Sequence, residues 1–279
     1  MSRYRVAVDV GGTFTDFVIQ DTHTGTALTN KVLSTTQDQA RGVLTGLREE
    51  VEDFGQVISL VHGNTVGLNA LLERRGTRVL FITTDGFRDV LRLGRGDRRD
   101  IFALQYRKPK PLVPVTDVET LSERVDVDGS VRLPLDESGI DSIVERIEAE
   151  GISSVAVCLL HAYRNPVHEL RVRELLVERV PSLNVSLSHE IAPEWREYER
   201  SSTTALNAYI APQVDRYLTS LMGRLEEDGF ESVLHIMQCS GGVTTAEVAR
   251  RTPVQALLSG PVGGTVGGVR LAHELGRRT

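Results

Sequence analysis

Asp9-Val-Gly-Gly-Thr-Phe-Thr-Asp16 joins two β-rich runs near the beginning of the sequence. A β-rich run, Tyr4 to Val10, leads into it, and a second such run, Phe17 to Gln20, follows it. Gly11 and Gly12 allow backbone conformations that other residues avoid and a close approach to a ligand, so that successive N–H groups can point at phosphate oxygens. The stretch is therefore predicted to be a phosphate-binding β-hairpin turn.

The side chains of this turn suit a nucleotide. Thr13 and Thr15 add hydroxyl donors, whereas Asp9 and Asp16 would repel phosphate and are better suited to hold Mg²⁺ or its waters, or to act as a base. An ordinary Gly-Gly hairpin with capping Thr and Asp residues is the alternative. The complete eight-residue string after a buried strand favours phosphate binding, with ATP as the expected ligand.

Strand and helix patterns alternate along the rest of the chain. The opening strands are followed by a helix over residues 37–54 and, further on, by a strand–helix–strand pattern over residues 57–83. A hairpin over residues 122–133, closed by Asp128-Gly129 as a type I′ turn, precedes a second α/β unit. A long helix over about 194–228 and a last helix complete the pattern, and this alternation predicts the α/β class.

Composition excludes several classes of protein. The 279 residues include 32 Lys plus Arg and 38 Asp plus Glu, a net charge of −6 without a long basic run, which argues against a nucleic-acid surface. The sequence contains neither a signal-peptide pattern nor an apolar run long enough to span a membrane, so a cytoplasmic protein is expected. Cys158 and Cys239 lack CxxC spacing, and they are expected to be small apolar residues in a reducing compartment.

Seven further sequence strings narrow the kind of protein to which the turn could belong. Together with it, they resemble the N-terminal part of the hydantoinase A and 5-oxoprolinase family, which belongs to the actin-like ATPase superfamily and also holds β subunits of acetone-type carboxylases. The strings are His62-Gly-Asn-Thr-Val66, Asn69-Ala-Leu-Leu-Glu-Arg74, Thr83-Thr-Asp-Gly-Phe-Arg-Asp-Val90, Gly94-Arg95, Ser188-His-Glu190, Arg196-Glu-Tyr-Glu-Arg-Ser-Ser-Thr-Thr204 and Leu258-Ser-Gly-Pro-Val-Gly-Gly264.

The resemblance implies an architecture. It implies an actin-like ATPase (ribonuclease H-like) lobe with an inserted or adjoining α/β domain. Residues 1–190 would be the hydantoinase/oxoprolinase N-terminal domain with the phosphate hairpin, and residues 191–279 the beginning of the hydantoinase A domain. A second Asp-x-Gly-Gly-Thr-x-Thr-Asp-like string is absent from the sequence, so the second lobe is expected to be missing and the chain to be partial.

The resemblance also implies a reaction. ATP, with Mg²⁺ or another divalent cation, would phosphorylate the carbonyl oxygen of a lactam or hydantoin, and water would then open the ring. Expected partners are the cyclic amide, a hydantoinase B-type subunit and further copies in an oligomer, with neither nucleic acid nor membrane. The alternatives are a subunit of an ATP-dependent acetone-type carboxylase, and a non-catalytic fragment that needs a partner chain.

Three further residues are candidates for catalysis. Arg88 and Arg95 lie in the arginine-rich loop Arg88 to Arg99 and are expected to bind a substrate carboxylate or the transferring phosphoryl group, although a solvated loop has the same composition. His62 ends a predicted strand, where α/β proteins place ligand residues. A structural histidine is the alternative for His62.

A second candidate for anion binding lies near the end of the sequence. Ser259, Gly260, Gly263 and Gly264 are predicted to open a helix, where unpaired backbone N–H groups converge and can bind a phosphate. A simple helix cap is the alternative.

Overall fold

The protein is described by a computed structural model covering residues 3–35, 38–97 and 101–276. It forms two compact units. Unit 1 consists of Met1–Arg75 and Gln213–Thr279, and unit 2, Gly76–Pro212, is inserted between these two parts. The units therefore do not follow the expected boundary at residues 190–191, which remains a prediction about sequence modules.

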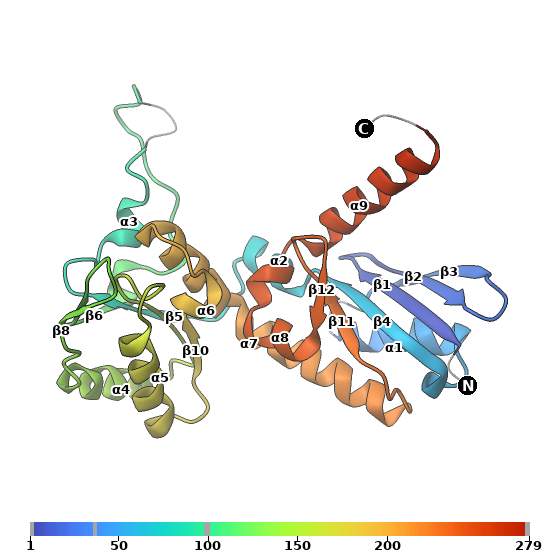
Figure 1. Ribbon diagram of the computed structural model, residues 1–279, viewed down its shortest axis with the longest axis horizontal. Coiled ribbons are helices and arrows are strands. Elements are labelled where there is room, and N and C mark those ends of the chain that lie inside the picture. The colour runs from blue at the N-terminus through green and yellow to red at the C-terminus, as the bar shows by residue number, and fades with distance from the viewer. Residues whose placement is uncertain (1–2, 36–37, 98–100, 277–279) are drawn as a thin grey trace. The chain divides into compact units, whose positions relative to one another are not determined.

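Unit 1 contains a six-stranded sheet in the order β12-β11-β4-β1-β2-β3. The first three strands form an antiparallel meander, and β4 and β11 continue it as strands parallel to β1 (Figure 1). The strands are β1 (Tyr4–Val10), β2 (Phe14–Asp21), β3 (Ala27–Leu33), β4 (Val57–Asn64), β11 (Leu234–Met237) and β12 (Val243–Thr245).

One face of this sheet carries the core of unit 1. Val6, Val8 and Phe17 are almost completely buried because side chains alternate along β1 and β2, and they pack against α1 and the second part of α7. Gly46 of α1 has no room for a Cβ, which would lie 2.4 Å from the Phe17 ring. The helices of unit 1 are α1 (Gln39–Glu50), η1 (Phe54–Gln56), α2 (Val66–Leu72), the second part of α7 (Glu197–Glu227), α8 (Ala246–Arg251), η3 (Pro253–Ala256) and α9 (Ser259–Glu274).

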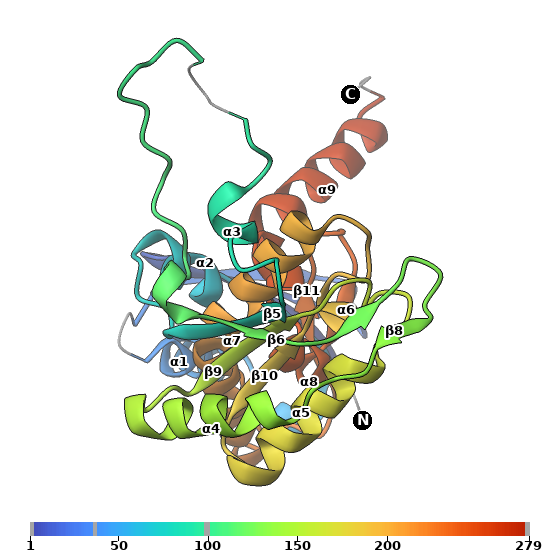
Figure 2. The same ribbon diagram turned by 90° about the vertical axis from the view of Figure 1, so that its left-hand side faces the viewer.

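Unit 2 is built on a four-stranded parallel sheet in the order β10-β9-β5-β6. Helices α4 and α5 cover one face of it (Figure 2), and the first part of α7 packs on the other, where Ser154 Oγ donates to the carbonyl of Ala208 at 2.7 Å. Its elements are β5 (Val79–Thr84), α3 (Val90–Leu93), η2 (Val115–Asp117), β6 (Val118–Leu121), β7 (Arg124–Val125), β8 (Val131–Leu133), α4 (Ser138–Glu150), β9 (Ser154–Cys158), α5 (Val167–Arg179), β10 (Asn184–Leu187) and α6 (Ser188–Ile191).

These sheets and helices confirm the predicted α/β class. The predicted type I′ turn between β7 and β8 is wrong, however, because such a turn needs positive φ at both Asp128 and Gly129, and only Gly129 has it, at +90°. The N–H of Gly129 donates to the carbonyl of Asp126, so the loop is a tight turn followed by a left-handed glycine. Within the described ranges, every helix is too short or too polar to cross a bilayer.

Candidate functional site

The turn between β1 and β2 is held from two sides. The N–H of Gly11 donates to the carbonyl of Phe14 at 2.9 Å, which closes the turn. Ser34, just after β3, donates through Oγ to the carbonyl of Gly11 at 2.8 Å and through its N–H to the carbonyl of Thr13 at 2.9 Å. These three hydrogen bonds hold the shape of the turn.

The tip of the turn presents donors to solvent. Among the described residues, the N–H groups of Gly12 and Thr13 have no hydrogen-bond acceptor. A Cβ on Gly12 would meet no atom within 4 Å, so a ligand can approach the backbone there. Neither Gly11 nor Gly12 has a positive φ, contrary to the expectation that they adopt conformations closed to other residues. Gly11 is needed because a Cβ would lie 3.0 Å from the Phe14 carbonyl oxygen.

Two expected phosphate contacts are not supported by this geometry. The N–H of Gly11 is already used inside the turn. Thr15 is 1% exposed, and its Oγ1 lies 3.0 Å from Ser34 Oγ. Strand alternation turns Thr15 into the core, because it belongs to the same face of β2 as Phe17. Both residues thus stabilise the turn, and the free donors belong to Gly12 and Thr13.

The Asp9 carboxylate lies beside two glycines. Asp9 pairs with Gly63 across the parallel strands β1 and β4, and a Cβ on Gly63 would lie 2.8 Å from Asp9 Oδ1. A Cβ on Gly260, at the start of α9, would lie 3.7 Å from Oδ1 and 3.9 Å from Oδ2. Partial burial raises the pKa of the Asp9 carboxyl, and the nearby charge of Asp16 raises it further. Because the two glycines have no side chains, there is room for a ligand beside this carboxylate at the carboxyl ends of β1 and β4.

Asp16 lies directly opposite Asp9 in the hairpin. It forms an ion pair with Lys31 of β3 at 2.9 Å. In the described part of the chain, no group of three or more His, Cys, Asp or Glu side chains could hold a metal ion. Two carboxylates fit Mg²⁺ only when waters or phosphate oxygens supply the other ligands, which is the usual manner in which proteins bind this ion.

The start of α9 is only partly available to a ligand. Ser259 is completely buried, and its Oγ lies 3.5 Å from the N–H of Asn64. A Cβ on Gly263 would lie 2.9 Å from Met237 Sδ, so this glycine allows α9 to pack on β11. Both residues have packing roles that account for them. Gly260, beside Asp9, and Gly264, with open space around it, remain candidates for anion binding.

His62 is placed inside unit 1. It is 1% exposed, on the same face of β4 as Leu60, and its Nε2 lies 2.7 Å from the hydroxyl of Tyr217. Burial lowers the pKa of His62 to about 4, so the ring is neutral at pH 7. This placement favours the structural alternative over the expected catalytic role, because a side chain enclosed by core residues cannot reach a substrate.

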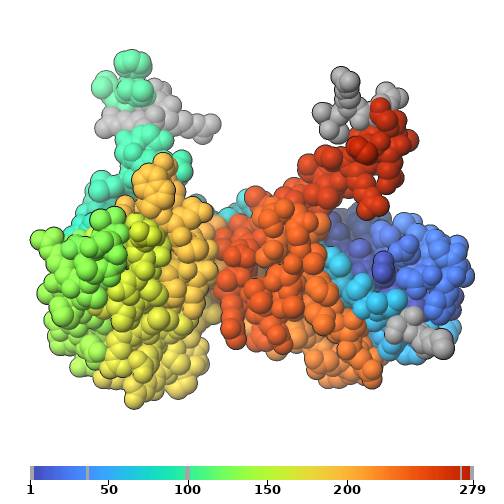
Figure 3. Space-filling model, viewed as in Figure 1, coloured from blue at the N-terminus to red at the C-terminus, as the bar shows by residue number. Residues whose placement is uncertain are grey.

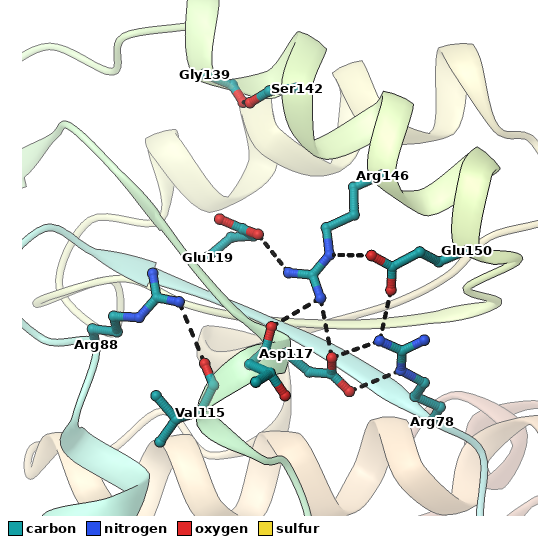
Figure 4. Close-up of polar contacts among 10 residues, drawn as sticks. Arg78, Arg88, Val115, Asp117, Glu119, Gly139, Ser142, Arg146 and Glu150 are labelled. Carbon is teal, nitrogen blue, oxygen red and sulfur yellow. Dashed lines mark hydrogen bonds and ion pairs between the residues drawn. The ribbon is translucent and has the colours of Figure 1, made fainter.

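Arg88 and Arg95 belong to unit 2 and have partners there. Arg88 donates to the carbonyl of Val115 at 3.4 Å, next to an ion-pair network in which Asp117 accepts from Arg78 and Arg146 (Figure 4). Arg95 Nε donates to Glu199 Oε1 at 2.6 Å. Their expected contacts with substrate remain predictions. Arg98 and Arg99 of the same loop lie outside the described residues.

Sequence reasoning missed four residues that shape the site. Gly63 and Asn64 stand in the string His62-Gly-Asn-Thr-Val66, but neither has a titratable side chain, whereas His62 beside them does. Ser34 and Lys31 reach the turn only through the pairing of β2 with β3. That pairing places Lys31 directly opposite Asp16, so the contact depends on a register that the local sequence pattern does not fix.

Comparison with known proteins places this geometry in a family. The sequence model for the hydantoinase/oxoprolinase N-terminal region matches residues 5–180, and the model for hydantoinase/oxoprolinase matches residues 200–279. Caprolactamase subunit alpha of Pseudomonas jessenii is 33% identical over 98% of this chain and 41% of its own length. 5-Oxoprolinase 1 of Arabidopsis thaliana is 32% identical over 95% of this chain and 23% of its own.

A comparison of structures gives the same relationship as the sequence matches. The nucleotide-free structure of acetone carboxylase, an ATP-dependent enzyme by its description, superposes with a TM-score of 0.88 at 28% identity, covering 99% of this chain and 41% of that one. The chain thus spans less than half the length of these relatives. Both matched regions and the shared fold agree with the resemblance carried by the turn and the seven strings. The chain belongs to the hydantoinase/oxoprolinase family.

Proposed function

We propose that this chain provides the ATP-binding part of an enzyme that phosphorylates a cyclic amide of the hydantoin or 5-oxoproline kind, so that water can open the ring. The observation that carries the proposal is the arrangement around Asp9. Its carboxylate lies between Gly63 and Gly260 at the end of β1, and the turn that follows presents the free N–H groups of Gly12 and Thr13.

Each group in this arrangement has a role in the proposal. The N–H groups of Gly12 and Thr13, with the Thr13 hydroxyl, donate to phosphate oxygens. Gly260 offers a backbone N–H group in the first turn of α9 to the same anion. Gly264 lies one turn further, where N–H groups bond within the helix, and its part is to leave open space for the ligand. Asp9 and Asp16 hold a divalent cation, Mg²⁺ or a similar ion, which supplies neutralisation of phosphate charge. Burial raises the pKa of Asp9, and a cation beside its carboxylate would favour the ionised form.

The proposal extends to the whole protein. Unit 1 is taken to be one lobe of the actin-like ATPase (ribonuclease H-like) kind, which the antiparallel meander continued by parallel β4 and β11 supports. The second lobe is expected in the portion of the relatives beyond the matched region. Because the relatives include proteins named as subunits, a hydantoinase B-type partner and an oligomer in the cytoplasm belong to the same proposal.

A second candidate is a carboxylase subunit. The superposition on acetone carboxylase supports it, because that match covers nearly the whole of this chain. In such an enzyme the same phosphate site would serve a ketone or bicarbonate in place of a ring. The two candidates differ in the acceptor of the phosphoryl group and share the arrangement around Asp9.

ADP release separates the two candidates. Mg-ATP is supplied with 5-oxoproline, hydantoin or caprolactam, and separately with acetone and bicarbonate, to the chain alone and to the chain mixed with the remaining portion of caprolactamase subunit alpha. We expect release that depends on a cyclic amide, and Asp9→Asn to reduce it by about 100-fold or more because charge neutralisation is lost. Release that depends on bicarbonate would favour the carboxylase. No ring-dependent release in either preparation would contradict the proposed function.

A further inference from the structure

Unit 2 contains a pocket that the arrangement around Asp9 does not use. Its volume is about 980 Å³, and it lies between the segment that follows α3 and the first turns of α7. The segment, in teal, rises from the rest of unit 2 beside the gold start of α7 (Figure 3). The volume is within the range of small-molecule sites in proteins.

The strand order of unit 2 places this pocket beside a common type of ligand site. The connection after β5 leads to β6 on one side of the sheet, whereas the connection after β9 leads to β10 on the other side. In parallel α/β sheets, ligands bind outside the carboxyl ends of strands where the direction of connection reverses. The segment that lines the pocket begins just after β5, at this reversal.

The walls of the pocket are held by specific contacts. Lys108 Nζ donates to the carbonyl of Leu93, and lies 3.4 Å from that of Arg92, which fastens the returning segment to the end of α3. Gly94 has a φ of +57°, and a Cβ there would lie 3.6 Å from the Tyr198 ring. The positive φ favours glycine at this position, and the backbone there lies against the Tyr198 ring.

The pocket is more basic than the chain as a whole. Four cationic and two acidic side chains line it, although the net charge of the protein is −6. Arg95 is paired with Glu199 through Nε, and Arg92 with Asp89 at 3.6 Å. Among the described residues, Lys110 has neither a hydrogen bond nor an ion-pair partner. An ammonium group without a partner on the wall of a pocket favours an anionic ligand.

The remaining surface suits a ring. Tyr106 and Tyr198 line the pocket together with Leu112 and Val113. Aromatic side chains provide flat apolar area with a polar hydroxyl at one end, and they accommodate a small planar ring that carries polar groups. A ligand with a ring and one carboxylate therefore matches both the charge and the surface of the pocket.

We infer that this pocket binds the ring substrate and selects a cyclic amide that carries a carboxylate over a neutral one of the same size. That the ligand contains a ring rests on the proposed function. That it carries a carboxylate rests on the cationic side chains of the pocket. Lys110 and Arg92 attract the carboxylate, and the tyrosines contact the ring. Unit 2 then holds the substrate, whereas unit 1 holds the nucleotide.

Two ligands that differ only in the carboxylate test this inference. 5-Oxoproline and 2-pyrrolidinone share the five-membered lactam ring, and only the first is charged. Calorimetry on the 279-residue chain without ATP should show 5-oxoproline binding at least about tenfold more tightly, as one well-placed charged contact provides. The double variant Lys110→Gln/Arg92→Gln should weaken that binding by about fivefold or more.

Matched variants keep the result independent of the nucleotide site. Arg132→Gln removes an exposed cation of unit 2 outside the pocket, and Asp9→Asn alters the proposed phosphate site, so both should bind 5-oxoproline as the wild type does. The wild type and Asp9→Asn could both bind 5-oxoproline while the wild type shows no ATP turnover. That result would refute the proposed function but not the binding of the ring in this pocket. The inference is overturned by equal affinity for the two rings, by no binding up to about 10 mM, by displacement with an equal concentration of inorganic phosphate, or by unchanged binding in the double variant.

Discussion

Replacement of Arg200 by leucine is expected to lower the free energy of unfolding by about 3–5 kcal/mol, because it removes a buried charge from a hydrogen-bonded network. Arg200 is 1% exposed. Its guanidinium donates to the carbonyls of Leu159 at 2.7 Å and Glu194 at 3.1 Å, and to Ser188 Oγ at 3.1 Å. These contacts join α7 to the ends of β9 and β10, so their loss weakens the packing of α7 on the unit 2 sheet.

The loss extends to an acidic side chain. Glu169 is completely buried and accepts from Ser188 Oγ at 2.6 Å and His189 Nδ1 at 2.7 Å. Ser188 Oγ accepts from Arg200 and donates to Glu169, so it links the two charged groups. Without Arg200, the Glu169 carboxylate has no positive charge linked to it through Ser188, and the buried acceptors of the guanidinium are left unpaired. Urea unfolding followed by circular dichroism measures the change.

A matched arginine controls for the loss of a charge alone. Arg179 of α5 pairs with Asp141 at 2.6 Å and is about half exposed. Arg179→Leu should lower the free energy of unfolding by less than about 1 kcal/mol, as exposed ion pairs do. A change in Arg200→Leu no larger than that in Arg179→Leu would show that the buried network does not stabilise unit 2.

The free energy of unfolding is also expected to fall with acid through His62. Its pKa is about 4 in the folded chain because of burial, against 6.5 for a solvent-exposed histidine, as in the unfolded chain. The unfolded state therefore binds more protons between these values, so the contribution of His62 is complete above pH 6.5 and is lost as the pH falls towards 4. The difference between these two pKa values corresponds to a contribution of about 3 kcal/mol to the free energy of unfolding.

A variant that does not titrate isolates this effect. His62→Gln keeps a group able to bond with the Tyr217 hydroxyl but has no proton to gain. Between pH 7 and pH 4.5, the wild type should lose about 2–3 kcal/mol more than the variant in urea unfolding, and other groups cancel in the difference. Equal losses in the two proteins would mean that His62 is protonated in the folded state without penalty.

Local patterns predicted the elements of this fold well. The run Tyr4 to Val10 became β1 at the predicted bounds, because buried and exposed residues alternate along it as in a strand of a half-buried sheet. The continuous apolar run that begins at Ser154 became β9, buried on both faces between α7 and the helices α4 and α5.

The division into units could not be predicted in the same way. Unit 2 begins after Arg75 and ends at Pro212 inside a single helix. The helical pattern over 194–228 continues through this boundary because hydrophobic periodicity reports which side of a helix is buried and not which core buries it. Only contacts between residues far apart in sequence, such as Leu221 with the first strands, distinguish the two cores.

The sequence predicted the hairpin turn of residues 9–16, and the structure forms it. Phosphate binding by Asp9 and the turn stays a prediction, made because glycine and threonine residues after a buried strand suit phosphate. The roles of Thr15 and Ser259 followed from burial, which depends on the register of β2 and on the packing of α9. Gly63 shows the limit most clearly, because its lack of a side chain matters only once β4 is paired with β1 in a register that places it beside Asp9.

The proposed binding of ATP phosphates by the turn of residues 9–16 can be followed in amide NMR spectra of the chain, recorded with increasing Mg-ATP. We expect the signals of Gly12 and Thr13 to shift most, and Asp9→Asn to raise the apparent dissociation constant about tenfold or more through loss of a cation ligand, whereas Asp141→Asn leaves it unchanged. Signals of Gly12 and Thr13 that stay in place up to about 10 mM Mg-ATP, or that shift equally in Asp9→Asn, would contradict the account.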